Sequence, residues 1–307
     1  MKYSSLRERI RGYEDAYRIK LPRRTPLIIR VDGRAFHTLT RGLVEPWDVD
    51  FACTMDKVAS DLLREVSGAK VAYVQSDEIT LLVTDYDTYE TQPWFDKGLQ
   101  KIVSVSASIA TRSFNTRMSY YSDSPRDEKR IYADKAYATF DSRAFVVPRE
   151  EVCNVFVDRQ QDCIRNSILN LGQTIIGKKA IHEMSCEDIK NTLRLRDSKD
   201  AWESKDPYWK YGRVVTAEGG THPAPVFTED RKFIDKFVWP LHEEGQYSHP
   251  ESLGCLSPVP EAPEPNYPEK VDIKTVPMKE STKKTWKEKG RPLRRLPGRP
   301  INPKVNK

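Results

Sequence analysis

The sequence contains no apolar stretch of the roughly 20 residues that a membrane-spanning helix needs. Its charged N-terminus, residues 1–12, has no apolar segment of the kind found in secretion signals, so we expect neither a leader peptide nor a membrane partner. The five cysteines stand far apart and form no C-x-x-C pair, which argues against a zinc knuckle or a thiol redox motif. An odd number of dispersed cysteines fits a reducing compartment, and we therefore predict a cytoplasmic protein.

The composition predicts one sizeable core, with room for a smaller annex. The chain has 307 residues, of which 38% are hydrophobic and 31% are charged. The net charge of +6 is concentrated near the C-terminus, because residues 279–307 contain eleven Lys and Arg and, as acidic residues, Glu280 and Glu288. The remainder is near neutral or slightly acidic, so the pI near 8.9 gives no evidence of a basic face on the folded part.

Hydrophobic periodicity predicts a β-α-β-β-α-β order in the first half of the chain. Short apolar runs typical of buried strands occupy residues 27–32, 71–74, 79–83 and 144–147. Apolar residues recur at helical spacing over 48–66, where Asp48 suits the N-cap and Gly68 follows the end, and a second helix is expected over 95–114. This order is that of the ferredoxin-like split unit, an antiparallel sheet with two helices on one face. The expected fold class is therefore α+β.

The composition changes twice along the rest of the chain. Helices are expected over 150–171 and 186–196, within a mixed, aromatic-rich region. Prolines then crowd after Ser257, where neither a helix nor a strand ladder can form, and the basic segment follows. We therefore predict a sheet domain at 1–148, a helical and mixed extension packed on it at 149–256, and a Pro-rich linker with a disordered basic tail at 257–307.

Two aspartates, Asp32 and Asp77, are the residues best suited to chemistry. Asp32 ends the first strand, and Asp77 lies in the turn between the second and third strands. In the predicted topology the first strand lies beside this hairpin, so the two carboxylates can meet at one edge of the sheet. Mg²⁺ is commonly held by one or two carboxylates together with substrate phosphates, and two such ions can stabilise both oxygens of a phosphoryl transfer. The alternative is that Asp-Gly and Ser-Asp-Glu are two ordinary solvated turns.

The loop after Asp32 contains groups that suit a phosphate. Gly33 has no side chain, so its backbone can approach a phosphate or offer its carbonyl to a metal. Arg34 and His37 can donate hydrogen bonds to triphosphate oxygens. We expect Phe36 to anchor the loop in the core, and the alternative for His37 is an ordinary surface imidazole.

Three segments together resemble the motifs of the tRNA(His) guanylyltransferase family. Residues 29–37, IRVDGRAFH, resemble the family motif R-x-D-G-R-x-F-H. Residues 72–78, AYVQSDE, resemble its second motif, A-Y-x-Q-S-D-E, and residues 140–143, FDSR, followed by an apolar strand, resemble its third, F-D-x-R. One such motif would be a weak signal, but the three occur in the family's order and spacing over about residues 7–215.

The resemblance implies a polymerase-palm fold, with residues 1–148 as the catalytic domain, and the addition of nucleotides to the 5′ end of tRNA in the 3′–5′ direction. In this family ATP or GTP first activates the RNA 5′-phosphate, and the 3′-hydroxyl of an incoming GTP then attacks. The implied substrates are ATP, GTP and tRNA, the implied cofactor is a pair of Mg²⁺ ions, and the implied assembly is a homotetramer.

The motif match also implies roles for single residues. Asp32 and Asp77 would be the metal carboxylates, with the Gly33 carbonyl as a further ligand and Glu78 as a catalytic or supporting group beside them. The residues implied to bind the triphosphate are Asp32, Gly33, Arg34, Ala35, Phe36, His37, Ser76 and Asp77. Arg143 would pair with phosphate, which the fork of a guanidinium suits better than a lysine does; its alternative role is a structural surface ion pair.

Two departures from the family pattern concern the RNA and the triphosphate. Members that act on tRNA(His) have H-I-N-N-L-Y-N on the helix after the palm, where this chain keeps Asn166 and Asn170 but has Ile164 in place of the histidine. That change resembles the guanylyltransferase-like 3′–5′ polymerases, which repair truncated tRNA 5′ ends. Lys190 lies near the family's Lys-Asn pair and, with the two asparagines, is a candidate RNA contact. Glu45 stands where eukaryotic members tend to have lysine, which weakens the case for a triphosphate contact there.

Three other functions fit part of the pattern: repair of tRNA 5′ ends not restricted to tRNA(His), a palm-type nucleotide cyclase, and a catalytically inactive tRNA-binding module. A cyclase needs no RNA, so the F-D-x-R motif and the basic tail argue against it. A pure binding module has no need of the paired carboxylates. The basic tail itself either binds RNA backbone or is a disordered, solubilising segment.

Overall fold

The protein is described by a computed structural model over residues 5–120, 137–196, 201–218 and 220–239. All of these residues belong to one compact unit, Met1–Gly254. The Pro-rich linker and basic tail predicted at 257–307 lie outside the described residues. Within the described ranges, no helix is both long enough and apolar enough to cross a membrane.

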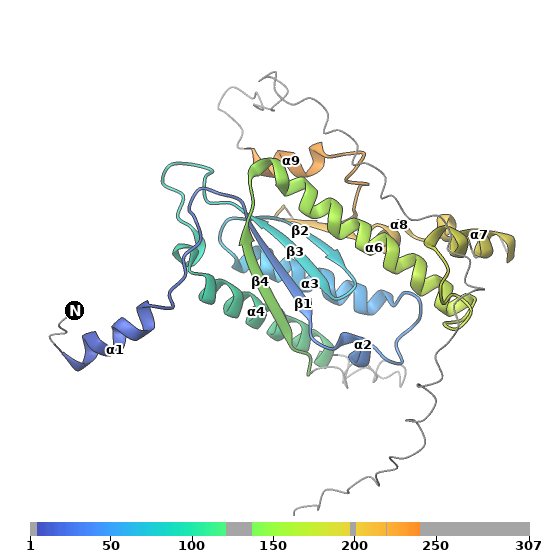
Figure 1. Cartoon of the computed structure of the whole chain (residues 1–307), viewed down its shortest axis with the longest axis horizontal. Coiled ribbons are helices and arrows are strands. Elements are labelled where there is room, and N and C mark those ends of the chain that lie inside the picture. The colour runs from blue at the N-terminus through green and yellow to red at the C-terminus, as the bar shows by residue number, and fades with distance from the viewer. Residues whose placement is uncertain (1–4, 121–136, 197–200, 219, 240–307) are drawn as a thin grey trace, which may run out of the picture. The chain divides into compact units, whose positions relative to one another are not determined.

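The centre of the unit is a six-stranded antiparallel sheet with the strand order β4-β1-β3-β2-β5-β6 (Figure 1). Its strands are β1 (Leu27–Gly33), β2 (Ala69–Gln75), β3 (Glu78–Val83), β4 (Phe140–Val146), β5 (Arg213–Thr216) and β6 (Thr221–Pro223). The first four strands, with the helices between them, confirm the predicted order and the α+β class. The sheet has two more strands than predicted, because β5 pairs with β2 and β6 with β5, so the C-terminal extension continues the same sheet.

The described α-helices are α1 (Leu6–Asp15), α2 (Phe36–Leu39), α3 (Val49–Glu65), α4 (Leu99–Ser119), α6 (Val152–Ile175), α7 (Cys186–Arg196), α8 (Pro207–Lys210) and α9 (Lys232–Val238). The predicted cap of α3 is present, since the Asp48 carboxylate accepts a hydrogen bond from the Phe51 backbone N–H at 2.8 Å. Gly68 follows α3 with a φ of 82°, and a Cβ added there would lie 2.2 Å from the Thr84 carbonyl oxygen. Glycine is therefore required where the chain turns from α3 into β2.

Helix α4 begins four residues later than predicted. The segment Trp94–Lys97 forms a short 3-10 turn in which Phe95, Asp96 and Lys97 have positive φ values, so it cannot belong to a regular α-helix. Lys97 is buried in this turn, where its Nζ donates to the Thr25 carbonyl at 2.7 Å and pairs with the Asp85 carboxylate at 3.3 Å. These contacts fix the turn against the chain that leads into β1.

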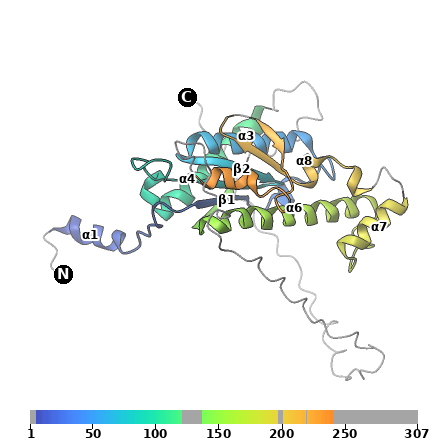
Figure 2. The same ribbon diagram turned by 90° about the horizontal axis from the view of Figure 1, so that it is seen from above.

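Helical layers cover opposite faces of the sheet (Figure 2). On one face α3 and α4 pack over a buried cluster that includes Ile29 and Met55. On the other face α6 and α9 cover a second cluster that includes Ile28 and Phe156. Ile28 and Ile29 belong to different clusters because successive strand side chains point to opposite faces. The predicted pair of helices on one face is therefore correct, and the extension adds a layer on the other.

A third cluster, rich in tryptophan, lies beside the second half of α6. Its buried members are Ile168, Leu171, Ile181, Ile189, Leu193, Trp202 and Trp209. The Trp202 indole N–H donates to Ser167 Oγ at 2.9 Å, and the Cys163 thiol lies 3.7 Å from the Trp209 carbonyl. These contacts hold α6 to the 3-10 turn Trp202–Ser204 and to α8, so that they form one wall at the end of the sheet.

Candidate functional site

The two predicted aspartates meet at one end of the sheet. Asp32 lies near the end of β1, and the strand register places Glu78 of β3 opposite it on one side and Asp141 of β4 on the other. Asp77 lies in the tight turn between β2 and β3, and its backbone carbonyl accepts a hydrogen bond from the Gly33 N–H at 3.2 Å. Directly opposed residues in an antiparallel pair have Cβ atoms roughly 4.5–5.5 Å apart. Asp32 therefore lies between two further carboxylates and next to the turn that contains Asp77.

The crowding of carboxylates raises pKa values at this end of the sheet. Burial, followed by the charge of Asp32, raises the pKa of Asp77 to about 6. Burial also raises the pKa of Asp32, with further contributions from Glu78 and Asp141 that Arg143 partly opposes. Several negative charges in a half-buried place are unfavourable unless a cation neutralises them. The geometry therefore favours a bound cation, and perturbed carboxyl groups of this kind are typical of functional sites.

Two arginines flank these carboxylates and differ in how firmly they are held. The Arg143 guanidinium is 3.9 Å from the Asp32 carboxylate and 3.7 Å from that of Asp141, and its side chain is 54% exposed. Distances this long describe a loose ion pair without a hydrogen bond. Arg159 of α6 is mostly buried and lies 3.5 Å from the Glu78 carboxylate. Arg143 can therefore turn toward an incoming phosphate, whereas Arg159 is part of the scaffold.

The segment after Asp32 is not the open loop that the sequence predicts. Ala35 has a left-handed conformation, with φ 57°, and the short helix α2 begins at Phe36. The Phe36 side chain is buried and packs among three other rings, those of Phe51, Phe114 and Phe140. Its predicted anchoring role is therefore confirmed. Arg34 and His37 are exposed on either side of this anchor.

Gly33 leaves room for the Phe36 ring below the end of β1. A Cβ added at Gly33 would lie 2.3 Å from Cδ2 of Phe36, far inside the separation at which carbon atoms attract. Any other residue at this position would displace the ring from its buried place. The glycine therefore serves the packing of the segment, in addition to the backbone access inferred from the sequence.

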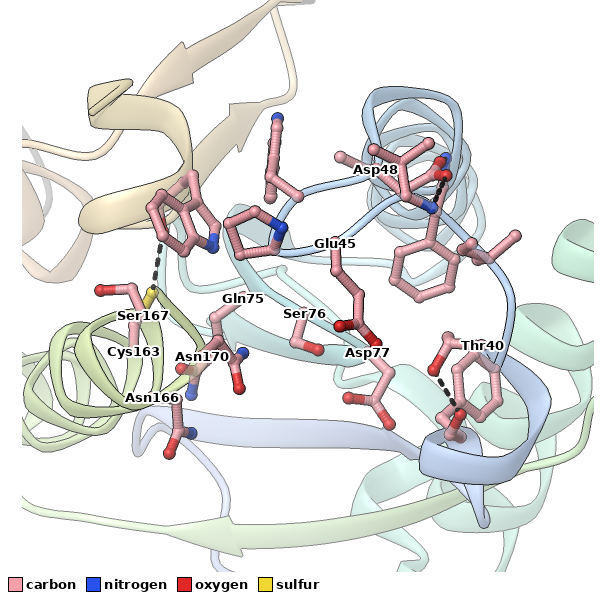
Figure 3. A pocket seen from close by; sticks show the side chains of 18 of the residues that line it. Thr40, Glu45, Asp48, Gln75, Ser76, Asp77, Cys163, Asn166, Ser167 and Asn170 are labelled. Atoms are coloured by element: carbon pink, nitrogen blue, oxygen red, sulfur yellow. Dashed lines mark hydrogen bonds between the residues drawn. The ribbon is translucent and has the colours of Figure 1, made fainter. Parts of the chain in front are cut away.

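A cavity of about 430 Å³ lies beside Asp77, between the 36–48 segment and α6 (Figure 3). Six of the predicted site residues line it: Phe36, His37, Ser76, Asp77, Asn166 and Asn170. Figure 3 shows that Asp77 and Glu45 point into the same space from different segments. The other predicted nucleotide contacts, which do not line the cavity, are Asp32, Gly33, Arg34, Ala35 and Arg143. The volume of the cavity is within the range found for sites that bind small molecules.

Sequence reasoning missed several residues that line this cavity, among them Trp47, Gln75, Gln173, Trp209 and Arg213. Gln75 belongs to the second motif and could have been included on that ground. Gln173 follows Asn170 by three residues on α6, so helical spacing was the available signal. Arg213 had no such signal, because β5 brings it to the cavity from a distant part of the sequence.

Lys190, a candidate RNA contact, and Ile164, which replaces the family's histidine, both have partners within the chain. The Lys190 Nζ pairs with the Glu187 carboxylate at 2.8 Å and lies 5.8 Å from the Trp202 ring centroid. Ile164, at the position of the family's histidine, packs against the tryptophan-rich cluster. Lys190 does not line the cavity, and its contact with RNA stays a prediction.

Sequence comparison relates most of the described chain to one family. Residues 7–148 match the family model described as tRNAHis guanylyltransferase. The tRNA(His) guanylyltransferase of Debaryomyces hansenii is 30% identical over 206 residues, which are 63% of this chain and 74% of that protein. The matched region contains all three motifs and both aspartates.

Comparison with solved structures gives the same relationship. A bacterial tRNA(His) guanylyltransferase-like protein in complex with ATP is 39% identical, with a TM-score of 0.71, and the match covers 76% of this chain and 99% of that chain. A bacterial protein of the same description in complex with GTP is 36% identical, with a TM-score of 0.64 and the same coverage.

Proposed function

Because the chain belongs to the tRNA(His) guanylyltransferase family, we propose that it adds nucleotides to the 5′ end of a tRNA in the 3′–5′ direction. It is a nucleotidyltransferase, and its nucleotide substrates are GTP and ATP. The observation that carries this proposal is the pair of Asp32 and Asp77 beside a cavity of about 430 Å³. The pair offers oxygen ligands for a metal, and the cavity offers room for a nucleotide.

The carboxylates of Asp32 and Asp77 fit Mg²⁺. Both are hard oxygen donors, and their raised pKa values indicate negative charges that a cation would neutralise. No group of three or more His, Cys, Asp or Glu side chains that could hold a metal ion is found among the described residues. Mg²⁺ is usually held by one or two carboxylates together with substrate phosphates. Asp32, Asp77 and the Gly33 carbonyl would hold two Mg²⁺ ions, which when bound stabilise the charge that develops on phosphoryl oxygens.

Other groups around the carboxylates hold the substrates. Ser76 and His37 line the cavity beside the metal end and bind triphosphate oxygens. Arg143, half-exposed on the neighbouring strand, pairs with a phosphate through its guanidinium fork. Glu78 accepts a hydrogen bond from the Gln75 side-chain amide at 3.0 Å. This bond fixes the turn between them and therefore the position of the Asp77 carboxylate.

The reaction consists of two phosphoryl transfers. The RNA 5′-phosphate attacks the α-phosphorus of ATP, diphosphate leaves, and an adenylyl anhydride forms at the RNA end. The 3′-hydroxyl of GTP then attacks the RNA 5′-phosphorus, and AMP leaves. Both steps move negative charge onto phosphate oxygens, and the loosely held guanidinium of Arg143 can turn to pair with that charge.

The identity of the RNA depends on the wall formed by α6. Ile164 stands where the family has the histidine that is linked to recognition of tRNA(His), and its side chain packs against the tryptophan-rich cluster. This observation favours a second candidate function, the templated repair of truncated tRNA 5′ ends by the same two transfers.

A nucleotide-incorporation assay tests the proposed activity. The protein is incubated with Mg²⁺, ATP, labelled GTP and either full-length tRNA(His) or a tRNA that lacks its first 5′ nucleotide, both 5′-monophosphorylated. We expect Mg²⁺-dependent incorporation that is lost in Asp77→Ala and retained in Asp15→Ala, a matched change of a carboxylate on α1 that pairs with Arg18.

The two RNAs separate the two candidate functions. Extension of tRNA(His) opposite its discriminator base supports the guanylyltransferase activity, whereas templated extension of the truncated tRNA alone supports repair. Equal, background-level incorporation by the wild type and Asp77→Ala on both RNAs would contradict the proposed enzyme.

We further propose that the protein works in the cytoplasm as a homo-oligomer, a tetramer by resemblance. Helix α1 buries none of its residues, and its exposed apolar side chains Leu6, Ile10 and Tyr13 share one stripe, which suits contact with a second copy. Light scattering should show a smaller assembly for the Leu6→Glu/Ile10→Glu variant, and an unchanged mass would contradict this role of α1.

The cysteines in the described ranges are free thiols, which suits a reducing compartment such as the cytoplasm: Cys53, Cys153, Cys163 and Cys186.

A further inference from the structure

Helix α6 carries a mostly buried cation that the proposed reaction does not use. The Arg159 side chain is 17% exposed and faces three carboxylates, those of Asp158, Asp162 and Glu78. Two of these belong to α6 itself, since the Arg159 Nε donates to Asp158 at 2.9 Å and its Nη1 to Asp162 at 3.2 Å. Glu78 comes from the start of β3, directly after Asp77. Arg159 is therefore a charged link between α6 and the turn that contains Asp77.

The Glu78 carboxylate is held from two sides. One of its oxygens accepts a hydrogen bond from the Gln75 amide at 3.0 Å, and the other lies 3.5 Å from Nη1 of Arg159. The second separation is long for a hydrogen bond, so the attraction is mainly between the two charges. The Glu78 side chain is only 15% exposed, and charges attract more strongly in such surroundings than in water. Arg159 therefore neutralises Glu78 and keeps its carboxylate turned toward α6.

Glu78 is close enough to the metal carboxylates to interfere with them. It follows Asp77 in the chain and lies opposite Asp32 in the strand register, where Cβ atoms are roughly 4.5–5.5 Å apart. Without a partner, its carboxylate would be a third hard oxygen donor at the metal site. Mg²⁺ requires near-octahedral coordination, and the positions that the protein leaves open are filled by water and substrate phosphates. A third carboxylate would occupy a position that a phosphate oxygen needs.

We propose that Arg159 is a positioning residue that keeps Glu78 out of the metal site and so leaves coordination positions open to substrate phosphates. This inference rests on the proposed function, in which Asp32 and Asp77 hold the metal. Two neighbours in one turn then have different roles, because Asp77 binds the ion and Glu78 stays with α6. Loss of Arg159 should strengthen the binding of the free ion and at the same time slow the reaction.

The first test measures Mn²⁺ binding to the full-length protein by electron paramagnetic resonance, without nucleotide or RNA, because Mn²⁺ takes the same oxygen ligands as Mg²⁺. In Arg159→Met the released Glu78 carboxylate should join the ligands, so Mn²⁺ should bind about threefold or more tightly than in the wild type. The kcat of Mg²⁺-dependent GTP incorporation should fall about tenfold. A purely structural role would weaken metal binding and activity together. Equal or weaker Mn²⁺ binding, or an unchanged kcat, would overturn the inference.

The second test determines whether the effect acts through Glu78. In the Glu78→Gln protein, Arg159→Met should change the Mn²⁺ affinity by less than about twofold, because no carboxylate is left to release. This double variant also leaves neither member of the pair as an unpaired buried charge, which guards against misfolding. Tighter Mn²⁺ binding of the same size in the Glu78→Gln protein would show that Arg159 does not act through Glu78.

Two further changes on α6 complete the test. Arg159→Lys keeps a positive charge opposite Glu78 and should retain the wild-type Mn²⁺ affinity and most of kcat; a loss of kcat as large as in Arg159→Met would contradict a role for the charge. Arg165→Met is the matched control, since this exposed cation pairs with Asp162 at 2.8 Å and should not affect Mn²⁺ binding. Arg159→Ala replaces Arg159→Met if circular dichroism shows that the latter does not fold.

The outcomes separate this inference from the proposed function. If Arg159→Met is folded and binds Mn²⁺ as the wild type does, Arg159 does not position Glu78, and wild-type GTP incorporation that needs Asp77 leaves the proposed enzyme intact. If the wild type and Asp77→Ala bind Mn²⁺ equally and incorporate no GTP, the proposed function fails and the role of Arg159 fails with it.

Discussion

Asp77 is a residue in which function and stability conflict. Its pKa in the folded protein is about 6, raised from its ordinary value of 3.8 by burial and by Asp32, so the folded state binds this proton more readily than the unfolded chain does. Without a metal, the free energy of unfolding should therefore rise as the pH falls from 7 through 6, and this contribution should level off near pH 4. At pH 7 the charged carboxylate destabilises the metal-free protein.

Urea unfolding in EDTA at pH 7 and pH 5 measures this effect. The gain on acidification should be larger in the wild type than in Asp77→Asn, by on the order of 1–2 kcal/mol. Asp77→Asn, which has no charge to lose, should also be the more stable of the two at pH 7. The same pH dependence in both proteins would show that Asp77 does not titrate in this range.

Gly33 is a position where one methyl group should disturb both packing and binding. In Gly33→Ala the new Cβ would meet the Phe36 ring at 2.3 Å, so we expect a loss of about 1–3 kcal/mol of unfolding free energy and weaker binding of nucleotide. The double variant with Phe36→Leu makes room for the methyl group and should lose less than the sum of the two single changes. Strictly additive losses in chemical denaturation would rule out this contact as the cause.

Residues in short motifs were predictable, and residues joined by the fold were not. Asp32 and Asp77 were identified because each lies where an apolar run ends in a turn, a pattern visible within a few residues. The position of Arg213 at the cavity depends on its ion pair with Asp56 and on the pairing of β5 with β2. Both contacts bring together segments that are distant in the sequence. A side chain whose partners come from tertiary pairing has no local pattern that reveals it.

At the scale of elements, Asp61 joins the two helices that cover one face of the sheet. Its carboxylate on α3 accepts hydrogen bonds from Ser113 Oγ at 2.6 Å and Arg117 Nη2 at 2.8 Å, both on α4, and it is almost fully buried. In Asp61→Asn a neutral amide replaces the carboxylate and accepts fewer hydrogen bonds from charged donors. We therefore expect the free energy of unfolding, measured in urea, to fall by about 2–3 kcal/mol. The control is Asp15→Asn, which changes an exposed carboxylate that pairs with Arg18. It should change the free energy of unfolding by less than about 0.5 kcal/mol. Similar losses in both variants would argue against a specific tie between α3 and α4.

The elements were predictable where a hydrophobic pattern persisted for several turns or for a whole strand. Helix α3, with its Asp48 cap and following glycine, was placed to within about a residue at each end, as was α7. The start of α4 was wrong because the positive φ values of the 3-10 turn depend on the burial of Lys97. Strands β5 and β6 were missed because runs of four and three residues are too short to show an alternating pattern.

At the scale of the whole molecule, we expect the site to bind nucleotide without residues 258–307. Every residue of the candidate site and of its cavity precedes residue 258. Deletion of residues 258–307 should therefore leave Mg²⁺-dependent GTP binding unchanged, and the thermal midpoint should move by less than about 2 °C. A large loss of nucleotide affinity would show that the tail contributes to the site.

The same deletion distinguishes the two interpretations of the tail. If its lysines and arginines bind RNA phosphates, tRNA affinity should fall and its dependence on salt should become shallower. If the tail only solubilises the chain, tRNA affinity should be unchanged and aggregation at low salt should increase.

The late position of β5 in the sequence has a consequence for how the protein is made. A nascent chain that has reached β4 already contains both aspartates and the four strands around them, but β2 then lacks its neighbour on one side. The ribosome adds about 5–20 residues per second, so β2 waits on the order of ten seconds for β5. During this interval β2, with its valines and tyrosine, has an unpaired edge of backbone N–H and C=O groups. Nascent chains on neighbouring ribosomes can pair with that edge.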